Sequence, residues 1–274
     1  MSVPIRYLVS DIDGTLVTRD KTLTPAAVDA VAEARAVGLA FTVISSRPPR
    51  GMAGVVERLG VSLPFAAFNG GNLVAPDMTV IRALRLDRTV AEAALGLLAQ
   101  RRVDAWVFAD GAWMVRDPKG ARVQHERHTV GFDPVVVADF TAVVDRIDKI
   151  VAVSDDAAAL SSLETEARAA WGATANIERS QSYYLDFTHP QANKGEAVRA
   201  LAGMLGVGLA ATAVIGDMTN DVAMFKVAGF SVVMGQSPPE VKAAADVVTR
   251  SNEDDGFAYA VRQFIVPRAA GRDA

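Results

Sequence analysis

Residues 7–16 read Tyr-Leu-Val-Ser-Asp-Ile-Asp-Gly-Thr-Leu, and this stretch decides how the rest of the chain is interpreted. The apolar residues at its start predict a buried β-strand, which Gly14 would end. Side chains alternate along a strand, so Asp11 and Asp13 would point the same way. Adjacent carboxylates repel each other, so the pair needs a cation or one member must hold a proton. The stretch therefore predicts a polar site at the end of a buried strand.

The string Asp-x-Asp-Gly-Thr-Leu resembles the nucleophile motif of the haloacid dehalogenase (HAD) superfamily of phosphotransferases. The resemblance implies that the Asp11 carboxylate is a nucleophile, which takes phosphate as an aspartyl-phosphate. It also implies that Asp13 is the acid and base, protonating the leaving alcohol and then activating water. Dehalogenases of the superfamily lack an aspartate two residues after the nucleophile, so Asp13 favours phosphate chemistry.

The bulk properties of the chain fit a globular protein long enough for two domains. It has 274 residues, half of them hydrophobic, and its net charge of −4 gives no basic surface for nucleic acid. The absence of cysteine excludes disulfides and thiolate metal sites, and it fits a cytoplasmic location. We expect no membrane association, because no apolar stretch reaches ~18 residues and the first residues show no signal-peptide pattern.

Strands and helices alternate in both terminal parts of the chain. This alternation predicts a parallel α/β sheet, in which ligands bind outside the carboxyl ends of the strands. The fold class is therefore α/β, with a Rossmann-like core formed by residues 1–83 and 188–274. After the first strand, the expected strands are 39–44, 65–68, 213–215, 231–234 and 247–248, and the expected helices are 26–37, 50–59, 195–205, 221–227, 239–244 and 256–264. Residues 267–274 are polar and are expected to fray.

Residues 84–187 show a different order, in which helices are followed by hairpins. This order predicts a separate α+β unit with an antiparallel sheet, inserted into the core. Tyr183 and Tyr184 alternate on one of its strands, so at most one of them would face the site. The expected elements are helices at 89–101 and 155–171, a strand at 149–153, and hairpins at 104–116 and 174–187.

Two polar residues at the ends of predicted core elements are candidate phosphate ligands. Ser45 ends the second strand, where its hydroxyl and nearby backbone N–H groups could hold a phosphate oxygen or simply cap a helix. Lys194 opens the helix at 195–205, where it could offset the charges of Asp11 and a phosphate, or could lie on the surface as an ordinary lysine.

The run Gly-Asp-Met-Thr-Asn-Asp after the strand at 213–215 is a candidate metal loop. A hard cation such as Mg²⁺ prefers carboxylates, carbonyls and waters. Three protein groups could supply its ligands: the carboxylates of Asp11 and Asp217 and the backbone carbonyl of Asp13. Two further residues, Asn220 and Asp221, could orient these ligands from outside. The alternative is an ordinary loop.

These motifs, with Asn69-Gly70 and the turn at 252–256, resemble the Cof-type branch (type IIB) of the HAD superfamily. In that branch an α/β cap lies between the serine and lysine motifs, where the insertion at 84–187 falls. The usual Thr-Gly-Arg of the branch reads Ser45-Ser46-Arg47 here. Arg47, Asn69 and Gly70 are candidate contacts to the substrate or the cap.

The predicted function is a Mg²⁺-dependent phosphatase. The resemblance suggests that its substrates are small phosphorylated metabolites such as sugar phosphates. One alternative is a phosphomutase of the same superfamily, which keeps a bisphosphate intermediate instead of hydrolysing it. The other is a non-enzymatic phospho-acceptor module, against which Asp13 and the long insertion both argue.

Overall fold

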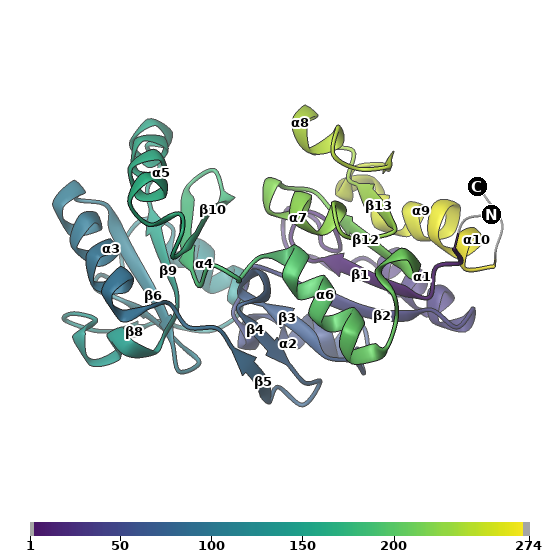
Figure 1. The fold of residues 1–274 in the computed structure, drawn as a ribbon, viewed down its shortest axis with the longest axis horizontal. Coiled ribbons are helices and arrows are strands. Elements are labelled where there is room, and N and C mark those ends of the chain that lie inside the picture. The colour runs from purple at the N-terminus through teal and green to yellow at the C-terminus, as the bar shows by residue number, and fades with distance from the viewer. Residues whose placement is uncertain (1–2, 271–274) are drawn as a thin grey trace.

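The computed structural model describes residues 3–270 and contains two β-sheets (Figure 1). The strands of the first, the core sheet, are β1 (Tyr7–Asp11), β2 (Ala40–Ile44), β3 (Phe65–Ala67), β4 (Asn72–Val74), β5 (Val80–Ala83), β12 (Thr212–Gly216), β13 (Phe230–Val233) and β14 (Val247–Val248). Their order is β14-β13-β12-β1-β2-β3-β4-β5. The strands from β14 to β3 run parallel, whereas β4 and β5 are antiparallel additions at one edge. This parallel sheet confirms the predicted α/β fold class.

Helices cover both faces of the core sheet. They are α1 (Pro25–Ala36), α2 (Pro49–Arg58), α6 (Lys194–Leu205), α7 (Val222–Phe225), α8 (Pro239–Lys242), α9 (Gly256–Ala260) and α10 (Val266–Ala269). Apolar residues of α1, α2 and α9 pack on one face, and those of α6, α7 and α8 pack on the other. The strands are buried on both faces, which explains why they read as continuous apolar runs.

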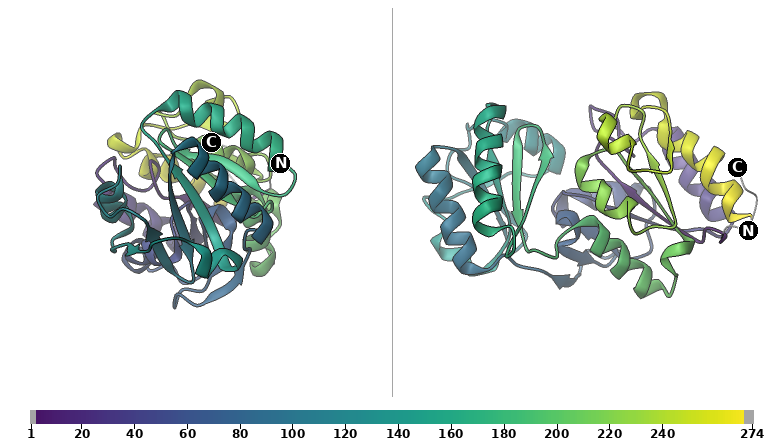
Figure 2. Two further views of the ribbon diagram at one scale, coloured as in Figure 1. Left: turned by 90° about the vertical axis from the view of Figure 1, so that its left-hand side faces the viewer. Right: turned by 45° about the horizontal axis from the view of Figure 1, so that its top comes forward.

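The second sheet, the insertion sheet, has six strands in the order β10-β11-β9-β6-β7-β8. Its elements are α3 (Arg88–Arg101), β6 (Asp104–Ala109), β7 (Ala112–Val115), α4 (Val123–Val130), β8 (Val135–Val136), β9 (Ile147–Val153), α5 (Ala157–Trp171), β10 (Asn176–Gln181) and β11 (Tyr184–Thr188). Figure 2 shows α3 and α5 on the outer face of this sheet, away from the core. The opposite face carries an aromatic cluster that includes Trp106, Phe108, Trp113 and Phe68 of the core.

Two of the predicted helices begin with side-chain caps. The Thr24 hydroxyl accepts a hydrogen bond from the Ala27 N–H at the start of α1, and Asn193 caps α6 in the same way. The expectation of a frayed tail at 267–274 is partly wrong, because α10 extends to Ala269; residues 271–274 lie outside the described residues. Within residues 3–270, no helix combines the length and the apolar character needed to cross a membrane.

The elements that the sequence did not predict are short or lack local signals. Strand β5 is exposed along its whole length, so it shows no apolar pattern. Helix α4 begins after Arg122, which adopts a left-handed conformation and forms no side-chain cap. Neither element could be recognised from periodicity or capping.

The central strand β1 should dominate the stability of the core. Leu8 is fully buried in it. Leu8→Ala should therefore lower the free energy of unfolding by about 3 kcal/mol, through lost apolar burial and the cavity left behind. Urea denaturation measures this change. Leu205→Ala is the matched control, because Leu205 is 36% exposed, and equal losses in the two variants would contradict the packing described above.

Candidate active site

Three of the predicted site residues come together at one edge of the core sheet. Asp11 ends β1, Ser45 follows β2 and Asp217 follows β12. These three strands are adjacent and parallel, so their carboxyl ends meet at the same edge. All three residues are buried. The structure thus gathers groups that are far apart in the sequence at the place where parallel sheets bind ligands.

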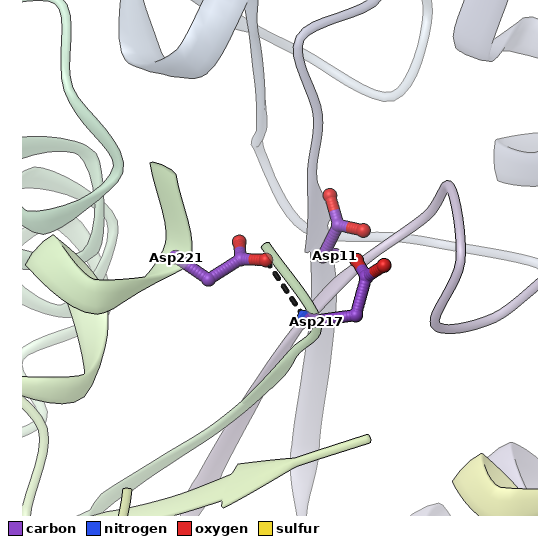
Figure 3. Close-up of side chains that lie close together, drawn as sticks. All are labelled: Asp11, Asp217 and Asp221. Atoms are coloured by element: carbon purple, nitrogen blue, oxygen red, sulfur yellow. Dashed lines mark hydrogen bonds between the residues drawn. The ribbon is translucent and has the colours of Figure 1, made fainter. Parts of the chain in front are cut away.

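The carboxylates of Asp11, Asp217 and Asp221 converge at this edge (Figure 3). One oxygen from each lies within 4.8 Å of the others. Burial raises the pKa of Asp11 to about 7 despite the opposing effect of Lys194. Burial, together with the charges of Asp11 and Asp221, also raises the pKa of Asp217 well above its usual range. Burial and crowding therefore favour the protonated forms of Asp11 and Asp217.

Lys194, the first residue of α6, lies between two of these carboxylates. Its Nζ is 2.6 Å from Asp11 Oδ1 and 2.6 Å from Asp221 Oδ1. Burial alone would lower the pKa of Lys194, but the two aspartates outweigh it and raise the pKa. The alternative of an ordinary surface lysine is wrong, since the side chain is 1% exposed.

Asp221 has an additional role in shaping the loop after β12. Its Oδ2 accepts hydrogen bonds from the backbone N–H groups of Asp217 (2.8 Å) and Met218 (2.9 Å). A Cβ on Gly216 would lie 2.4 Å from Asp221 Cγ, so only glycine allows this approach. Because both its oxygens already accept hydrogen bonds from the protein, Asp221 is better suited to orienting Asp217 than to binding a metal itself.

Gly14 leaves the space that the Asp217 carboxylate occupies. Its φ of +82° is a left-handed conformation, and a Cβ there would lie 2.2 Å from Asp217 Oδ2. The next residue, Thr15, donates a weak hydrogen bond of 3.4 Å to Asp217 Oδ1. The turn after the first strand is thus fitted to the loop after β12.

Asp13 lies beyond the end of β1 and is held by two cations. Arg47 donates hydrogen bonds from Nε and Nη2 at 2.7 and 2.8 Å, and Lys21 donates one at 2.7 Å. Burial would raise the pKa of Asp13, but these cations outweigh it and hold the pKa well below its usual range. Sequence reasoning missed Lys21, whose only signal was its position in the short loop that follows the motif.

The remaining predicted residues make contacts within the core. Ser45 Oγ accepts a hydrogen bond from the Arg47 N–H at 3.1 Å, which leaves its own proton free to be donated. Asn220 donates to the Asn69 side chain at 3.1 Å. Gly70 packs against α6, where a Cβ would lie 2.7 Å from that of Ala197. Asn69 thus contacts the loop after β12, and Gly70 contacts α6.

A small cavity of about 30 Å³ separates the core from the insertion. From the core it is lined by Asp13, Lys21, Ser46 and Arg47, and from the insertion by residues that include Glu126, Lys149, Tyr183 and Tyr184. The expectation that at most one tyrosine faces the site is wrong. Tyr183 precedes β11 and lies in the turn, so it does not follow the strand alternation that begins at Tyr184.

The carboxylate cluster fits a hard divalent cation. Asp11 and Asp217 present buried oxygens at one point, and one ammonium group faces three carboxylates. Oxygen donors and an uncompensated negative charge are what such a cation requires.

Residues 8–261 match the haloacid dehalogenase-like hydrolase family. The chain belongs to this family. The predicted resemblance is therefore confirmed over nearly the whole chain, and members of the superfamily generally use a divalent metal.

Two relatives of this hydrolase that align along almost their full length are phosphatases. The pyridoxal phosphate phosphatase of Escherichia coli is 24% identical over 279 residues, covering 95% of this chain and 99% of that protein. The 5-amino-6-(5-phospho-D-ribitylamino)uracil phosphatase of Bacillus subtilis is 22% identical, covering 95% and 98%. The predicted enzyme class, a phosphoric monoester hydrolase, is confirmed.

Solved structures share the fold of this hydrolase. A haloacid dehalogenase-like hydrolase from B. subtilis superposes with a TM-score of 0.85 at 21% identity, covering 95% of this chain and 100% of the other. A HAD subclass IIB sugar phosphatase superposes with a TM-score of 0.84 at 22% identity, covering 95% and 99%. The arrangement of core and insertion agrees with the predicted type IIB subgroup.

The raised pKa values of Asp11, about 7, and of Asp217 predict how stability depends on pH. The folded hydrolase holds protons on these groups that the unfolded chain releases near pH ~4, so the metal-free protein should lose stability as the pH rises from about 4 to 7. Asp217→Asn should weaken this loss. Urea unfolding after chelation, at about pH 5 and about pH 8, measures both effects.

The control for this prediction is Asp29→Asn, which changes an exposed aspartate of α1. Mg²⁺ should restore stability to the natural protein at the higher pH, because bound metal replaces the missing protons. An equal pH dependence in Asp217→Asn and the natural protein would show that the cluster is not the cause.

Proposed function

We propose that the protein is a Mg²⁺-dependent phosphatase that hydrolyses small phosphorylated metabolites, such as sugar phosphates, through an aspartyl-phosphate at Asp11. The observation that carries this proposal is the buried contact of 2.6 Å between Asp11 and Lys194 inside a carboxylate cluster at the strand ends. This contact supports the proposal because the carboxylate that would act as nucleophile lies beside a positive charge that can stabilise a phosphoryl group. The named substrates of the related phosphatases support the substrate class.

The metal ligands we propose are the carboxylates of Asp11 and Asp217 and the backbone carbonyl of Asp13. When bound, Mg²⁺ would neutralise charge on the phosphoryl oxygens. Asn220 and Asp221 would hold the ligand loop, as the hydrogen bonds of Asp221 to the backbone of that loop already suggest.

In the first half-reaction, an Asp11 carboxylate oxygen attacks phosphorus, and the bond from phosphorus to the leaving oxygen breaks. Lys194 and the Ser45 hydroxyl bind the phosphoryl oxygens and hold the group in line. In the second, water attacks phosphorus, the bond to Asp11 breaks, and inorganic phosphate leaves. One proton is given to the alcohol in the first step, and one is taken from water in the second.

Asp13 is the group we assign to both proton transfers. The ion pairs with Arg47 and Lys21 favour its carboxylate form, which is the form needed to accept a proton from water. To act as an acid Asp13 must first be protonated, so its ion pairs with Arg47 and Lys21 must weaken when substrate binds. A bound phosphate, itself an anion, would compete for Arg47 and Lys21.

We further propose that residues 84–187 act as a cap that selects the substrate, and that the enzyme works in the cytoplasm. The insertion covers the strand ends and lines the cavity over Asp13, which supports the first proposal. A phosphomutase remains the second candidate. Isomerisation of a hexose phosphate without net phosphate release would select it. Membership in a hydrolase family argues against the non-enzymatic phospho-acceptor.

Asp11→Asn should abolish turnover, because an amide is not a nucleophile. We expect a loss of at least ~10³-fold in kcat, the scale of a catalytic group that acts as part of a unit. Release of phosphate from p-nitrophenyl phosphate with Mg²⁺ measures it, and circular dichroism checks the fold. Asp29→Asn is the matched control. Activity within tenfold of the natural enzyme would refute the nucleophile.

Asp13→Ala should slow transfer from alkyl phosphates more than from aryl phosphates. An aryl oxide leaves without much protonation, whereas an alkoxide needs the proton that Asp13 supplies. Single-turnover rates of p-nitrophenyl phosphate and an alkyl phosphate separate the two cases. Equal losses for both esters would count against the acid role.

A further inference from the structure

The three successive carbonyls of residues 45–47, in the loop between β2 and α2, all accept hydrogen bonds. The first and third accept from the backbone N–H groups of the core turn at 68–69, at 2.8 and 3.0 Å. The second, that of Ser46, accepts from Lys149 Nζ at 3.0 Å. Lys149 belongs to β9 of the insertion. The insertion therefore supplies one of the three contacts that hold these carbonyls in place.

The contact from Lys149 reaches the Ser45 hydroxyl through a single peptide unit. The Ser46 carbonyl shares this unit with the Arg47 N–H, which donates to Ser45 Oγ at 3.1 Å. A peptide unit is planar, so a group that fixes its carbonyl also fixes the direction of its N–H. The ammonium group also polarises the carbonyl, which makes the N–H a better donor. Lys149 thus helps to orient the hydroxyl that we propose to bind a phosphoryl oxygen.

The surroundings of Lys149 give little reason for a charge other than this contact. The residue is 5% exposed, and its Nζ lies 5.7 Å and 5.2 Å from the ring centroids of Phe68 and Phe108. It pairs with Asp186 of the neighbouring strand β11 at 3.2 Å. A buried ion pair adds little net stability, because removing two charges from water offsets their attraction. The Ser46 carbonyl is the contact that apolar side chains in place of this pair would not make.

We propose that Lys149 is a positioning residue, which holds the Ser46–Arg47 peptide, and through it the Ser45 hydroxyl, in the geometry that binds the phosphoryl group. This inference rests on the proposed phosphatase function and adds that the insertion takes part in phosphoryl transfer itself. The contact concerns the phosphoryl group, which every ester shares, and not the leaving alcohol. Its loss should therefore slow all substrates by the same factor.

Lys149→Met removes the ammonium group and keeps most of the apolar side chain. The rate of phosphoryl transfer should fall between about tenfold and about 10²-fold, the scale for losing a hydrogen bond to a charged group or misplacing a binding group. Single-turnover reactions with Mg²⁺ should give the same factor for p-nitrophenyl phosphate and glycerol 1-phosphate. Lys119→Met is the matched control, because Lys119 is an exposed lysine of the insertion, and its rate should stay within about twofold of the natural one.

A double variant separates positioning from charge balance. Lys149→Met alone leaves Asp186 buried without its cation, which destabilises a protein by itself. Lys149→Met combined with Asp186→Leu removes the whole ion pair, so no buried charge is left unpaired. Circular dichroism checks that this protein is folded, and it carries the test even where the single variant does not fold. The double variant should remain as slow as expected for Lys149→Met, because the Ser46 carbonyl still lacks its donor.

Inhibition by orthovanadate, which resembles a phosphoryl group in transfer, gives a second measurement. Its inhibition constant should rise about tenfold or more in the double variant, because the loop at 45–47 holds the anion less well. The Mg²⁺ concentration that gives half-maximal activity should stay within about twofold, because the proposed metal ligands lie outside this loop. A general disturbance of the active site would change both quantities.

Three results would overturn the inference while leaving the phosphatase intact. Recovery of the natural rate in the double variant would show that Lys149 only balances the charge of Asp186. Losses that differ between the two esters would place Lys149 against the leaving alcohol. An unchanged inhibition constant for orthovanadate would show that the loop does not depend on Lys149. Failure of the natural enzyme to hydrolyse either ester would reject the proposed function and the inference together.

Discussion

The structure depends on one buried ammonium group, that of Lys194, placed between Asp11 and Asp221. Burying a charge costs free energy unless the charge is paired and hydrogen-bonded. Lys194 pairs with both Asp11 and Asp221, so the three buried groups stabilise one another. The pairing is incomplete, however, because Asp217 adds a third carboxylate to the same point. The fold therefore gathers three carboxyl groups around one ammonium group at the point where we propose that a cation and a phosphoryl group bind. Stability has been given up locally to create a binding site.

The backbone around this cluster is built to permit the close approach of charged groups. Gly14 and Gly216 leave room for the carboxylates of Asp217 and Asp221, respectively. Phe68 and Asn69 have φ values of 50° and 55°, which are unusual for residues other than glycine. Their N–H groups donate to the carbonyls of Arg47 and Ser45. The strained turn thus supports the loop that we propose to bind phosphate on one side, and on the other the Phe68 ring packs against Phe108 of the insertion.

Sequence patterns could place residues that lie at the ends of buried parallel strands. Asp11, Ser45 and Asp217 follow apolar runs, and the rule that ligands bind at strand ends brings them together. Lys194 needed the resemblance to a known motif, because a lysine at a helix start is common. The partners of Asp13 could not be foreseen in the same way. Lys21 reaches it from an irregular loop, and Arg47 turns toward it from the loop between β2 and α2.

The residues of the insertion were hardest to predict, because their direction depends on local irregularities. Glu126 lies on a helix without a recognisable cap, and Lys149 follows a register shift between β6 and β9. Tyr183 lies in a turn where strand alternation does not apply. Periodicity predicts the direction of side chains only in regular elements. It cannot predict the direction of a side chain that lies at a bulge, in a turn or on a helix without a recognisable cap. These are also the positions that line the cavity.

Asp11 and Asp13 show how one short motif can place two carboxyl groups in different electrostatic surroundings. The two residues are only two positions apart, yet their surroundings move their pKa values in opposite directions. Burial raises the pKa of Asp11 to about 7, whereas Arg47 and Lys21 overcome the effect of burial at Asp13 and lower its pKa. Environments that separate the pKa values of two nearby carboxyl groups assign them different tasks. At Asp11 a cation would favour the carboxylate that we propose attacks phosphorus, and at Asp13 the loss of a cation would favour the protonated acid that we propose. Binding a metal and a phosphate ester together would shift both groups toward their reactive forms, which links catalysis to the arrival of substrate.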